Sequence, residues 1–282
     1  MKKLCLIIMD GAGHDTTISE CGFLESLVAA KKAKRWKMRC CLPTISAPMY
    51  ETIHTGLAPQ DHGILSNEAI RRSMHPNIFS VAREAGRKTA IVGHSYFHTL
   101  YGDGSPFDPY EHAEINDPAQ PVPNARYYSL AGYSRANPCL PSEVDLCAQA
   151  HMLARRHQPD YLLLHSSGPD SIGHAYGGNS AEYRMQIWRI DNALSRFVPA
   201  LQALGYDILI TSDHGMNADG HHAGTDPVLT NTAFYWIGDA PGTPLDEILD
   251  QRCIAPTVLN QLGLTAPEGM AVATLSYAVR TA

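Results

Sequence analysis

The sequence predicts an α/β fold: a mostly parallel central sheet with helices on both faces, a three-layer sandwich, plus a small irregular cap. Three observations support this prediction. Short apolar runs recur along the chain, segments with helical periodicity lie between them, and one long stretch has neither pattern. Strands buried on both faces appear as continuous apolar runs, and the alternation of strands with helices produces parallel sheets.

The predicted strands are three strong apolar runs and two weaker ones. The strong runs are LCLIIM (4–9), DYLLLH (160–165) and DILIT (207–211), and the weaker ones are AIVG (90–93) and AFYWIG (233–238). Their length and their content of Ile, Leu and Val are typical of strands that are covered on both faces.

Three segments between these runs have helical patterns. Residues 78–86 precede the run at 90–93, residues 143–157 carry apolar side chains at roughly helical spacing, and residues 181–204 form the longest periodic stretch. Gly205 follows the last segment, at a position where glycine commonly ends a helix.

Residues 102–142 are rich in Pro, Gly, Asp and Tyr and have no sustained period. In a compact domain such a stretch is more often a functional loop or cap than a disordered linker. The chain has 282 residues, a length that suits one large domain. We therefore predict a single domain over 1–282, with a cap or insert around 95–142.

The composition argues against a nucleic-acid or membrane protein. The formal net charge is −6, and the one basic run, KKAKRWKMR (31–39), is more simply explained as a solvated helix face. The first apolar run stops at Asp10, too early for a signal peptide or a membrane span. The 7 cysteines follow no framework spacing, which favours reduced thiols. We expect a cytoplasmic protein with neither a membrane nor a nucleic-acid polymer as partner, and the oligomeric state stays open.

Acidic and imidazole side chains follow each of the three strong runs. The first run ends at Asp10, the second leads to Asp170 and His174, and the third ends at Asp213 and His214. Ligand sites in parallel sheets form beyond the carboxyl ends of the strands, so we expect these groups at one edge. A lone aspartate at a strand end is usually a turn or cap residue, but crowded aspartates repel one another unless a cation neutralises them.

A metal centre is the interpretation that explains all three strand ends together. With His221 or His222 the set offers six nitrogen and oxygen ligands, enough for two divalent ions. Carboxylates and imidazoles suit zinc or manganese, with zinc as the first expectation, and the lack of thiolates argues against a closed structural zinc site.

Ser46 is the candidate nucleophile. Pro48 stands two residues later, where the first turn of a helix tolerates proline. Ser46 would then lie at a helix N-terminus, where free N–H groups favour an anion such as phosphate. Taken alone, it would be interpreted as an ordinary N-cap serine.

Several motifs together resemble one known family. They are Asp10 after a strand, PTISAP (43–48), HTGLAPQDHGILSN (54–67), PDSIGH (169–174), SDHGM (212–216) and CIAPTVLNQLGL (253–264). These blocks are similar, in the same order, to those of the type I phosphodiesterase/nucleotide pyrophosphatase family of the alkaline phosphatase superfamily. The resemblance implies an alkaline phosphatase-like sandwich and metal-dependent hydrolysis of phosphodiester or pyrophosphate bonds in small molecules.

The resemblance also implies roles for individual residues. One ion would be held by Asp10, Ser46, Asp213 and His214. The other would be held by Asp170, His174 and His222, with His221 as the alternative to His222. Ser46 would form a covalent intermediate, and Asn67 would contact a phosphate oxygen. We expect the substrate pocket around Ala47 and His94.

Two departures from the family pattern leave the substrate open. Family phosphodiesterases typically have threonine where Ser46 stands, and a bulky aromatic residue where Ala47 stands. The alternative is a phosphomonoesterase, or a phosphonate hydrolase similar to the phosphonoacetate hydrolases. A monoesterase needs further cationic groups, for which the candidates are His54, Arg71, Arg72 and His94.

An alternative of another class is a non-catalytic metal-binding protein on this fold, although every expected type of ligand is present. A CxPxR motif, which a sulfatase would need, is missing. Among the other polar residues, His62 is expected to shape the turn that follows it, and Asp191 to be structural. His98 follows the same strand as His94, so a place in the pocket is one interpretation of it but not the favoured one; His165 is ambiguous.

Overall fold

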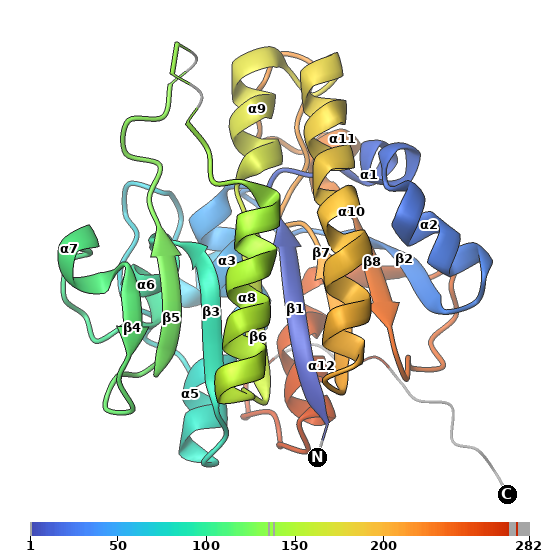
Figure 1. Cartoon of the computed structure of the whole chain (residues 1–282). Helices are drawn as coiled ribbons and strands as arrows, with labels where there is room; N and C mark the ends of the chain where they lie inside the picture. The colour runs from blue at the N-terminus through green and yellow to red at the C-terminus, as the bar shows by residue number, and fades with distance from the viewer. Residues whose placement is uncertain (1, 135, 138, 271–274, 276–282) are drawn as a thin grey trace, which may run out of the picture.

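The computed structural model describes residues 2–134, 136–137, 139–270 and 275, and one large sheet forms its centre (Figure 1). The strands are β1 Lys3–Met9, β2 Ala33–Arg39, β3 Thr89–His94, β4 Glu114–Asn116, β5 Asn124–Tyr128, β6 Tyr161–Ser166, β7 Tyr206–Thr211, β8 Asn231–Ile237 and β9 Ile248–Asp250. Within the described residues these 9 strands lie in the order β4-β5-β3-β6-β1-β7-β8-β2-β9.

The sheet is mostly parallel, as predicted. The neighbours β5, β3, β6, β1 and β7 all run in the same direction, whereas β4 is antiparallel to β5 and β8 is antiparallel to both β7 and β2. In the register of the central strands, Ile8 lies opposite both His165 and Thr211. The carboxyl ends of β1, β6 and β7 are therefore level with one another.

Helices cover both faces of the sheet (Figure 1). The helices α1 His14–Glu20, α2 Gly22–Ala29, α8 Glu143–His157 and α10 Ala181–Gln202 lie on one face. The helices α3 Ser46–Thr55, α5 Ile78–Glu84, α6 Tyr96–Tyr101 and α12 Ile254–Gln261 lie on the other. The remaining helical segments are α4 Pro59–His62, α7 Pro109–His112, α9 Gly168–Tyr176, α11 Pro227–Thr230 and the 3₁₀ turn Gln251–Cys253.

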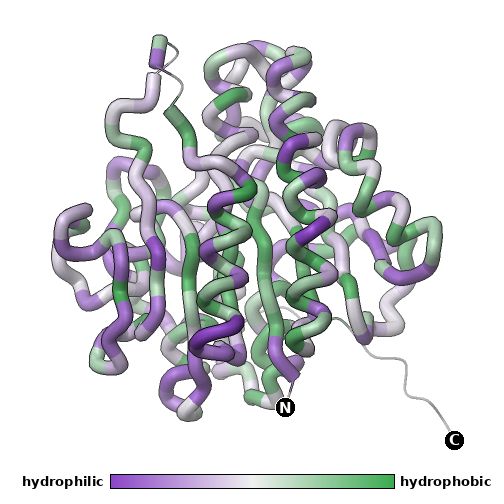
Figure 2. Tube along the Cα trace, viewed as in Figure 1, coloured by the Kyte–Doolittle hydropathy of each residue, from purple (hydrophilic) through white to green (hydrophobic). Residues whose placement is uncertain are grey.

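The central strands divide their side chains between two cores. In β1, Leu4, Leu6 and Ile8 face the core under α3, α5 and α12, and the alternate side chains face the core under α8 and α10. Burial on both faces is why these strands are continuous apolar runs in the sequence, and Figure 2 shows them as the hydrophobic centre of the molecule.

The structure confirms the predicted three-layer α/β fold and all five predicted strands. The predicted helix over 143–157 has the observed bounds, and those over 78–86 and 181–204 end two residues earlier than expected, at Glu84 and Gln202. Gly205 adopts a positive φ of 83°, a conformation that glycine reaches without strain. Within the described residues, every helix is too short or too polar to span a bilayer.

The interpretation of the basic run 31–39 as a helix face was wrong, because most of it forms β2. Trp36 and Met38 are buried in the core, while Arg39, the last residue of β2, is exposed. Pairing with β8 on one side and β9 on the other fixes the segment as a strand. The two buried side chains stand two residues apart, the spacing of a strand, but the surrounding charges hid this signal.

The stretch that lacks periodicity also contributes to the sheet. Residues 114–116 and 124–128 form β4 and β5, which extend the sheet beyond β3, while most of residues 129–142 are irregular. Ala125 and Tyr127 face the core, and the other three residues of β5 are partly exposed. A strand of five residues offers too few alternations to stand out in such a polar sequence.

Candidate metal and phosphate site

The polar residues predicted from three separate strand ends lie at one edge of the sheet. Asp10 directly follows β1, Asp213 and His214 follow β7, and Asp170 and His174 lie one turn apart on α9. In Figure 1, β1 and β5 point to this edge and α9 lies above it. The backbone N–H of Asp170 donates to the Asp10 carbonyl at 2.9 Å, which ties α9 to the end of β1.

Gly11 makes this close approach feasible. Its φ is 72°, and a Cβ atom at this position would lie 2.8 Å from the Cα of Asp170. A larger residue would therefore push α9 away from β1. The glycine keeps the carboxylates of the two segments within reach of one another.

The first group of candidate ligands surrounds His214. Its Nε2 lies 3.3 Å from Asp213 Oδ2, 3.6 Å from Asp10 Oδ1 and 3.3 Å from Ser46 Oγ. The carboxylate and imidazole atoms of this group lie within 4.8 Å of one another, a spacing that one ion could bridge. All four side chains are buried.

The second group is formed by Asp170, His174 and His222. Asp170 Oδ1 lies 3.3 Å from His174 Nε2 and 3.5 Å from His222 Nε2, and the two imidazole nitrogens are 3.1 Å apart. The groups adjoin, because the rings of His214 and His222 stack at 4.0 Å. His221 is exposed and its backbone N–H donates to Asn217, so the structure favours His222 of the two alternatives.

All three histidines present the same nitrogen to the site. Nδ1 of His174 is 2.7 Å from the Gly220 carbonyl, Nδ1 of His222 is 2.7 Å from the Thr44 carbonyl, and Nδ1 of His214 is 3.0 Å from the Gly215 carbonyl. A carbonyl can only accept, so in the neutral rings Nδ1 carries the hydrogen. Each Nε2 then has a lone pair directed into the site, as metal-binding histidines require.

The carboxylates have unused oxygens at the same place. Asp10 Oδ1, Asp170 Oδ1 and Asp213 Oδ2 are buried and have no hydrogen-bond partner among the described residues. A buried carboxylate oxygen without a partner costs free energy unless a cation or a proton compensates it. Unpartnered oxygens beside imidazole lone pairs fit divalent metal ions.

Without an ion, protons are favoured at these positions. Burial, with the neighbouring charge of Asp170 adding to it, raises the pKa of Asp10 to about 8. Burial and then Asp10 raise the pKa of Asp213 well above its usual range. The adjacent carboxylate of Asp170, which stabilises the protonated ring, raises the pKa of His174 to about 9. Such shifts are expected where acidic groups crowd together without a counter-ion.

Ser46 is the first residue of α3 rather than its N-cap, which is Ile45. Its hydroxyl therefore lies at the N-terminus of a ten-residue helix, with Pro48 in the first turn. Asn67 approaches the same turn, because its Oδ1 accepts a hydrogen bond of 2.9 Å from the Ala47 N–H. This bond sets the orientation of the amide and leaves its two N–H donors for another acceptor.

The other residues predicted for the pocket differ in their surroundings. Ala47 is fully buried in the hydrophobic core, so the prediction that its side chain lines a pocket needs correction: only its backbone N–H faces Asn67. His94 ends β3 beside the rings of Tyr96 and Tyr128. Burial lowers its pKa to about 3, with His165 adding to this and Asp170 opposing it. His94 therefore remains a candidate for substrate contact.

Several polar residues that the sequence singled out lie away from the ligands. His98 stacks near His112 at 4.3 Å under the cap and does not join the pocket with His94. His62 accepts a hydrogen bond from the Ile64 N–H at 3.2 Å and so shapes the turn that follows it, as expected. Asp191 accepts from two backbone N–H groups of α2, in agreement with a structural role.

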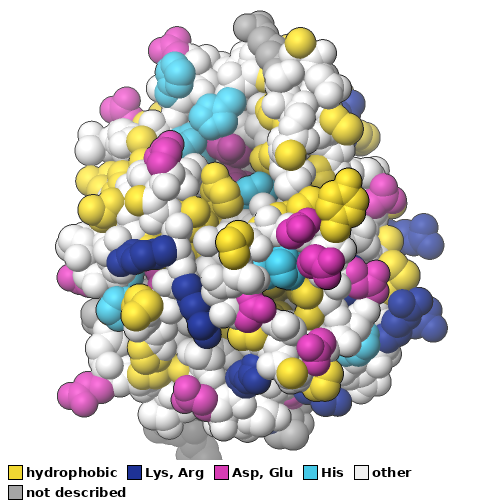
Figure 3. Space-filling model, turned by 90° about the vertical axis from the view of Figure 1, so that its left-hand side faces the viewer, with side chains coloured by type: hydrophobic (Ala, Val, Ile, Leu, Met, Phe, Trp, Pro, Cys, Tyr) yellow, Lys and Arg dark blue, Asp and Glu magenta, His cyan; other side chains and the backbone are white. Residues whose placement is uncertain are grey.

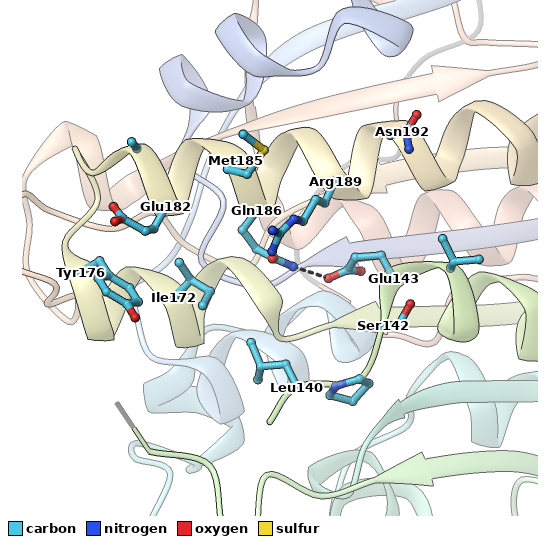
Figure 4. Close-up of a pocket in the computed structure, with 13 residues that line it drawn as sticks. Leu140, Ser142, Glu143, Ile172, Tyr176, Glu182, Met185, Gln186, Arg189 and Asn192 are labelled. Carbon is cyan, nitrogen blue, oxygen red and sulfur yellow. Dashed lines mark hydrogen bonds between the residues drawn. The ribbon is translucent and has the colours of Figure 1, made fainter. Parts of the chain in front are cut away.

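A separate cavity of about 700 Å³ lies on the outer side of α9, between α8 and α10 (Figure 4). Glu143 and Gln186 line it, together with the apolar side chains of Ile172 and Met185. Neither Asp170 nor His174 lines this cavity. Figure 3 shows histidine side chains gathered with acidic ones near the upper end of another face. Cavity size alone would therefore have pointed to the wrong surface.

Comparison with known proteins agrees with the geometry. The sequence model of the family described as type I phosphodiesterase/nucleotide pyrophosphatase matches residues 4–222. The chain belongs to this family. Human ectonucleotide pyrophosphatase/phosphodiesterase family member 1 is 26% identical over 223 residues, a match that covers 75% of this chain and 23% of the relative. The family member described here thus spans about a quarter of the length of that relative.

Solved structures show the same fold. An inactive murine ectonucleotide pyrophosphatase/phosphodiesterase 5 in complex with AMP superposes with a TM-score of 0.69 at 14% identity, over 95% of this chain and 96% of that one. Phosphonoacetate hydrolase from Sinorhizobium meliloti 1021 with phosphonoformate gives a TM-score of 0.53 at 22% identity, over 76% and 56% of the two chains.

Proposed function

We propose that this family member is a metal-dependent hydrolase of phosphodiester or pyrophosphate bonds in which Ser46 is the nucleophile. The observation that carries the proposal is the position of the Ser46 hydroxyl. It lies at a helix N-terminus, 3.3 Å from His214 Nε2. The same nitrogen lies 3.6 Å from Asp10 Oδ1 and 3.3 Å from Asp213 Oδ2, two carboxylate oxygens without hydrogen-bond partners among the described residues. A nucleophile, an anion-binding helix end and cation ligands are the groups that phosphoryl transfer needs.

The residues fit a two-ion arrangement. Asp10, Ser46, Asp213 and His214 would hold one ion, and Asp170, His174 and His222 would hold the other. We propose zinc as the metal, with manganese as the alternative, because imidazole and carboxylate ligands suit both. Bound ions would lower the pKa of the Ser46 hydroxyl and offset the charge of the phosphoryl oxygens.

The reaction would proceed through a covalent intermediate on Ser46. The Oγ–phosphorus bond forms while the bond from phosphorus to the leaving oxygen breaks, and the proton of the hydroxyl leaves with the released group. The other substituent stays on phosphorus as an ester of Ser46, and water later breaks the Oγ–phosphorus bond, releases the phosphomonoester and restores the hydroxyl. The amide of Asn67 and the N-terminus of α3 would bind the non-bridging oxygens. Donors held in place before the reaction stabilise the charge of the transition state without reorganisation.

The charges around the site support a diester over a monoester. A monoester carries additional negative charge, and three of the four cationic candidates are engaged elsewhere. His54 is buried in the core against Tyr50 and Tyr161. Arg71 donates to the Gly63 carbonyl and Arg72 to the Asp103 carbonyl. A substrate with a single negative charge needs no such partners.

Nucleotide-like compounds are the first substrates to test. The human relative is named a nucleotide pyrophosphatase/phosphodiesterase, and the murine structure contains AMP. Phosphonate hydrolysis is the second candidate, supported by the fold shared with phosphonoacetate hydrolase. A panel of bis-p-nitrophenyl phosphate, p-nitrophenyl phosphate, a dinucleotide and phosphonoacetate would separate these classes. Faster turnover of the monoester than of the diester would contradict the proposal.

The nucleophile is tested by Ser46→Ala. We expect turnover of the diester to fall by at least about 10³-fold, because both the attacking atom and a ligand are lost. Ser195→Ala is the matched control, since that hydroxyl is exposed on α10 and bonds only to the Asn192 carbonyl. Turnover by Ser46→Ala within tenfold of the control would exclude Ser46 as the nucleophile.

A further inference from the structure

A chain of buried hydrogen bonds runs behind Asp10. The Tyr50 hydroxyl bonds to Asp10 Oδ2, the oxygen that does not face His214. His165 Nε2 lies 2.7 Å from the same hydroxyl, and His165 Nδ1 lies 2.9 Å from the Tyr128 hydroxyl. Tyr50 and His165 are almost completely buried, with at most 1% of their surface exposed. Bulk water therefore does not reach the hydrogen bonds between Tyr50 and His165.

His165 Nε2 also lies 3.2 Å from Asp10 Oδ2, so Tyr50 and His165 both approach this oxygen. An ionised Asp10 can only accept, so Tyr50 donates to it and has no hydrogen left. His165 then carries its hydrogen on Nε2, where the Tyr50 oxygen at 2.7 Å and Asp10 Oδ2 at 3.2 Å are the acceptors. Its Nδ1 is left as an acceptor for the Tyr128 hydroxyl. The Tyr128 oxygen in turn accepts from the Ser167 N–H at 3.0 Å.

The rings of this chain are also fixed by packing. Tyr50 stacks on Phe97 at 4.7 Å and meets the edge of His165 at 5.0 Å. Tyr50 lies on α3, one helical turn after Ser46. The same helix thus carries the nucleophile and the hydroxyl that orients Asp10. Their relative positions depend on one rigid element.

We infer that Tyr50, held by His165 and Tyr128, is a positioning residue that orients Asp10 for metal binding. The inference rests on the proposed metal-dependent function and adds residues that lie outside the ligand set. With Oδ2 engaged by Tyr50, Asp10 presents Oδ1 toward His214. Without the Tyr50 hydroxyl, Oδ2 would keep only the longer contact of 3.2 Å to His165 Nε2, and the carboxylate could rotate.

Tyr128 extends the effect to the other half of the site. Ser167, whose N–H it binds, is the N-cap residue of α9, and α9 carries Asp170 and His174. Tyr128 thus contacts the segment that holds the second group of ligands, and through His165 and Tyr50 it reaches the first. Partners of this kind orient metal ligands and typically change metal affinity by about 10–100-fold when removed.

The test is metal binding to the full chain after its metal has been removed. Tyr50→Phe removes one hydroxyl and keeps the ring. We expect Zn²⁺ affinity, measured by competition with a chromophoric chelator, to fall by about tenfold or more. Tyr161→Phe is the matched control, because Tyr161 is equally buried but its hydroxyl bonds to His54 Nε2 at 3.1 Å. This control is expected to bind Zn²⁺ like the unmodified chain.

Two further measurements separate positioning from a general loss of structure. Both variants should unfold cooperatively, and kcat for the diester should fall in Tyr50→Phe while KM changes by less than about threefold. Tyr128→Phe should weaken Zn²⁺ binding less than Tyr50→Phe, because His165 and Tyr50 stand between Tyr128 and Asp10. If Tyr50→Phe binds Zn²⁺ as tightly as the Tyr161→Phe control, the inference is overturned. If Tyr50→Phe does not fold, the same comparison is made with Tyr128→Phe and decides the question. The proposed function is tested separately, by the turnover of Ser46→Ala. If that variant retains turnover, the proposed function fails, whatever the Zn²⁺ affinity of Tyr50→Phe.

Discussion

At the scale of single residues, the site divides the two oxygens of a carboxylate between different partners. Asp213 Oδ1 accepts from the N–H groups of Gly11 and His214, both at 3.0 Å, while its Oδ2 has no partner. Asp10 is divided in the same way between Tyr50 and an unpartnered Oδ1. One oxygen fixes the side chain, and the other is left for a cation. In the absence of an ion, the unpartnered oxygen lowers the stability of the folded protein.

Asp213→Asn measures how much the unpartnered carboxylate oxygen destabilises the metal-free protein. We expect the metal-free variant to be more stable than the metal-free parent by about 1–3 kcal/mol, because it replaces a buried acid with an amide that can donate to His214. The same change should abolish most of the rise in melting temperature that Zn²⁺ produces in the parent. Thermal unfolding with chelator and with Zn²⁺ measures both effects.

His221→Ala is the control for that experiment, because the side chain is exposed beside the site without entering it. It should leave both melting temperatures unchanged. A Zn²⁺-dependent rise that persists in Asp213→Asn would show that Asp213 is not a ligand.

Glu143 predicts a dependence of stability on pH. Burial raises its pKa to about 7, although Ser166 and Gln186 donate to it. Figure 4 shows the bond from Gln186. The folded pKa is above the unfolded value of 4.5, so its contribution is fully present below about pH 4.5 and is lost as the pH rises through 7. The loss would be roughly 3 kcal/mol.

Glu143→Gln should remove this dependence, since glutamine keeps an acceptor and does not ionise. Relative to the parent, the variant should therefore gain unfolding free energy between pH 5 and pH 8. Urea unfolding of both proteins across this range measures the difference. A constant difference would mean that Glu143 has an ordinary pKa in the folded protein.

At the scale of elements, the sequence pattern identified the strands that are buried on both faces and missed strands that are short or rich in charged residues, such as β4 and β2. The strands β1, β6 and β7 are continuous apolar runs, and α8 and α10 have long helical patterns. In contrast, the 7 residues of β2 are four basic and three apolar residues in mixed order, and β4 has three residues. Such strands form because neighbouring strands offer hydrogen bonds, which a local pattern does not encode.

Asp191 shows how one element is stabilised by another. It lies on α10, and its carboxylate accepts from the N–H groups of Phe23 at 2.7 Å and Leu24 at 3.1 Å. These belong to the first turn of α2, whose N-cap residue Cys21 offers no side-chain cap. A carboxylate that satisfies free N–H groups at a helix N-terminus stabilises that helix.

Asp191→Ala should therefore lower the free energy of unfolding by about 2 kcal/mol, since two buried N–H groups lose their acceptor. Asp191→Asn keeps one acceptor and should lose about half as much. Asn192→Ala, an exposed neighbour on the same helix, is the control. Diester turnover should stay unchanged in all three, because α2 lies away from the ligands. A destabilisation by Asp191→Ala no larger than that of the control would contradict the cap.

At the scale of the whole molecule, the sequence predicts the ligands better than their supports. Asp10, Asp170 and Asp213 were recognisable because each follows a strand, and a parallel sheet brings strand ends together. The sequence preferred His222 over His221, and the loop supports that preference because His222 approaches Asp170 while His221 is exposed. Tyr50 gave no signal, because its role depends on His165 and Tyr128 from distant parts of the chain. The cytoplasmic location and the absence of a nucleic-acid partner stay predictions.

The spread of the ligands along the chain determines how metal removal should act. The first group joins the ends of β1 and β7, and the second joins α9, which follows β6, to the loop at His222. Ions bound at these places would link the three central strands of the sheet. An ion that binds only the folded chain adds about 4 kcal/mol of stability at a free concentration 1,000 times its Kd.

Chelation should therefore lower the stability of the whole sheet in one step. We expect hydrogen exchange of the slowest amides in β1, β6 and β7 to accelerate together by about 10³-fold, the factor that corresponds to 4 kcal/mol. Asp213→Asn, which cannot hold the first ion, should respond much less to the chelator. If exchange accelerated only in α9 and in residues 212–222, the ions would order the edge of the sheet without supporting its centre. The joint response of three strands would instead make metal binding part of the folding free energy of this family member.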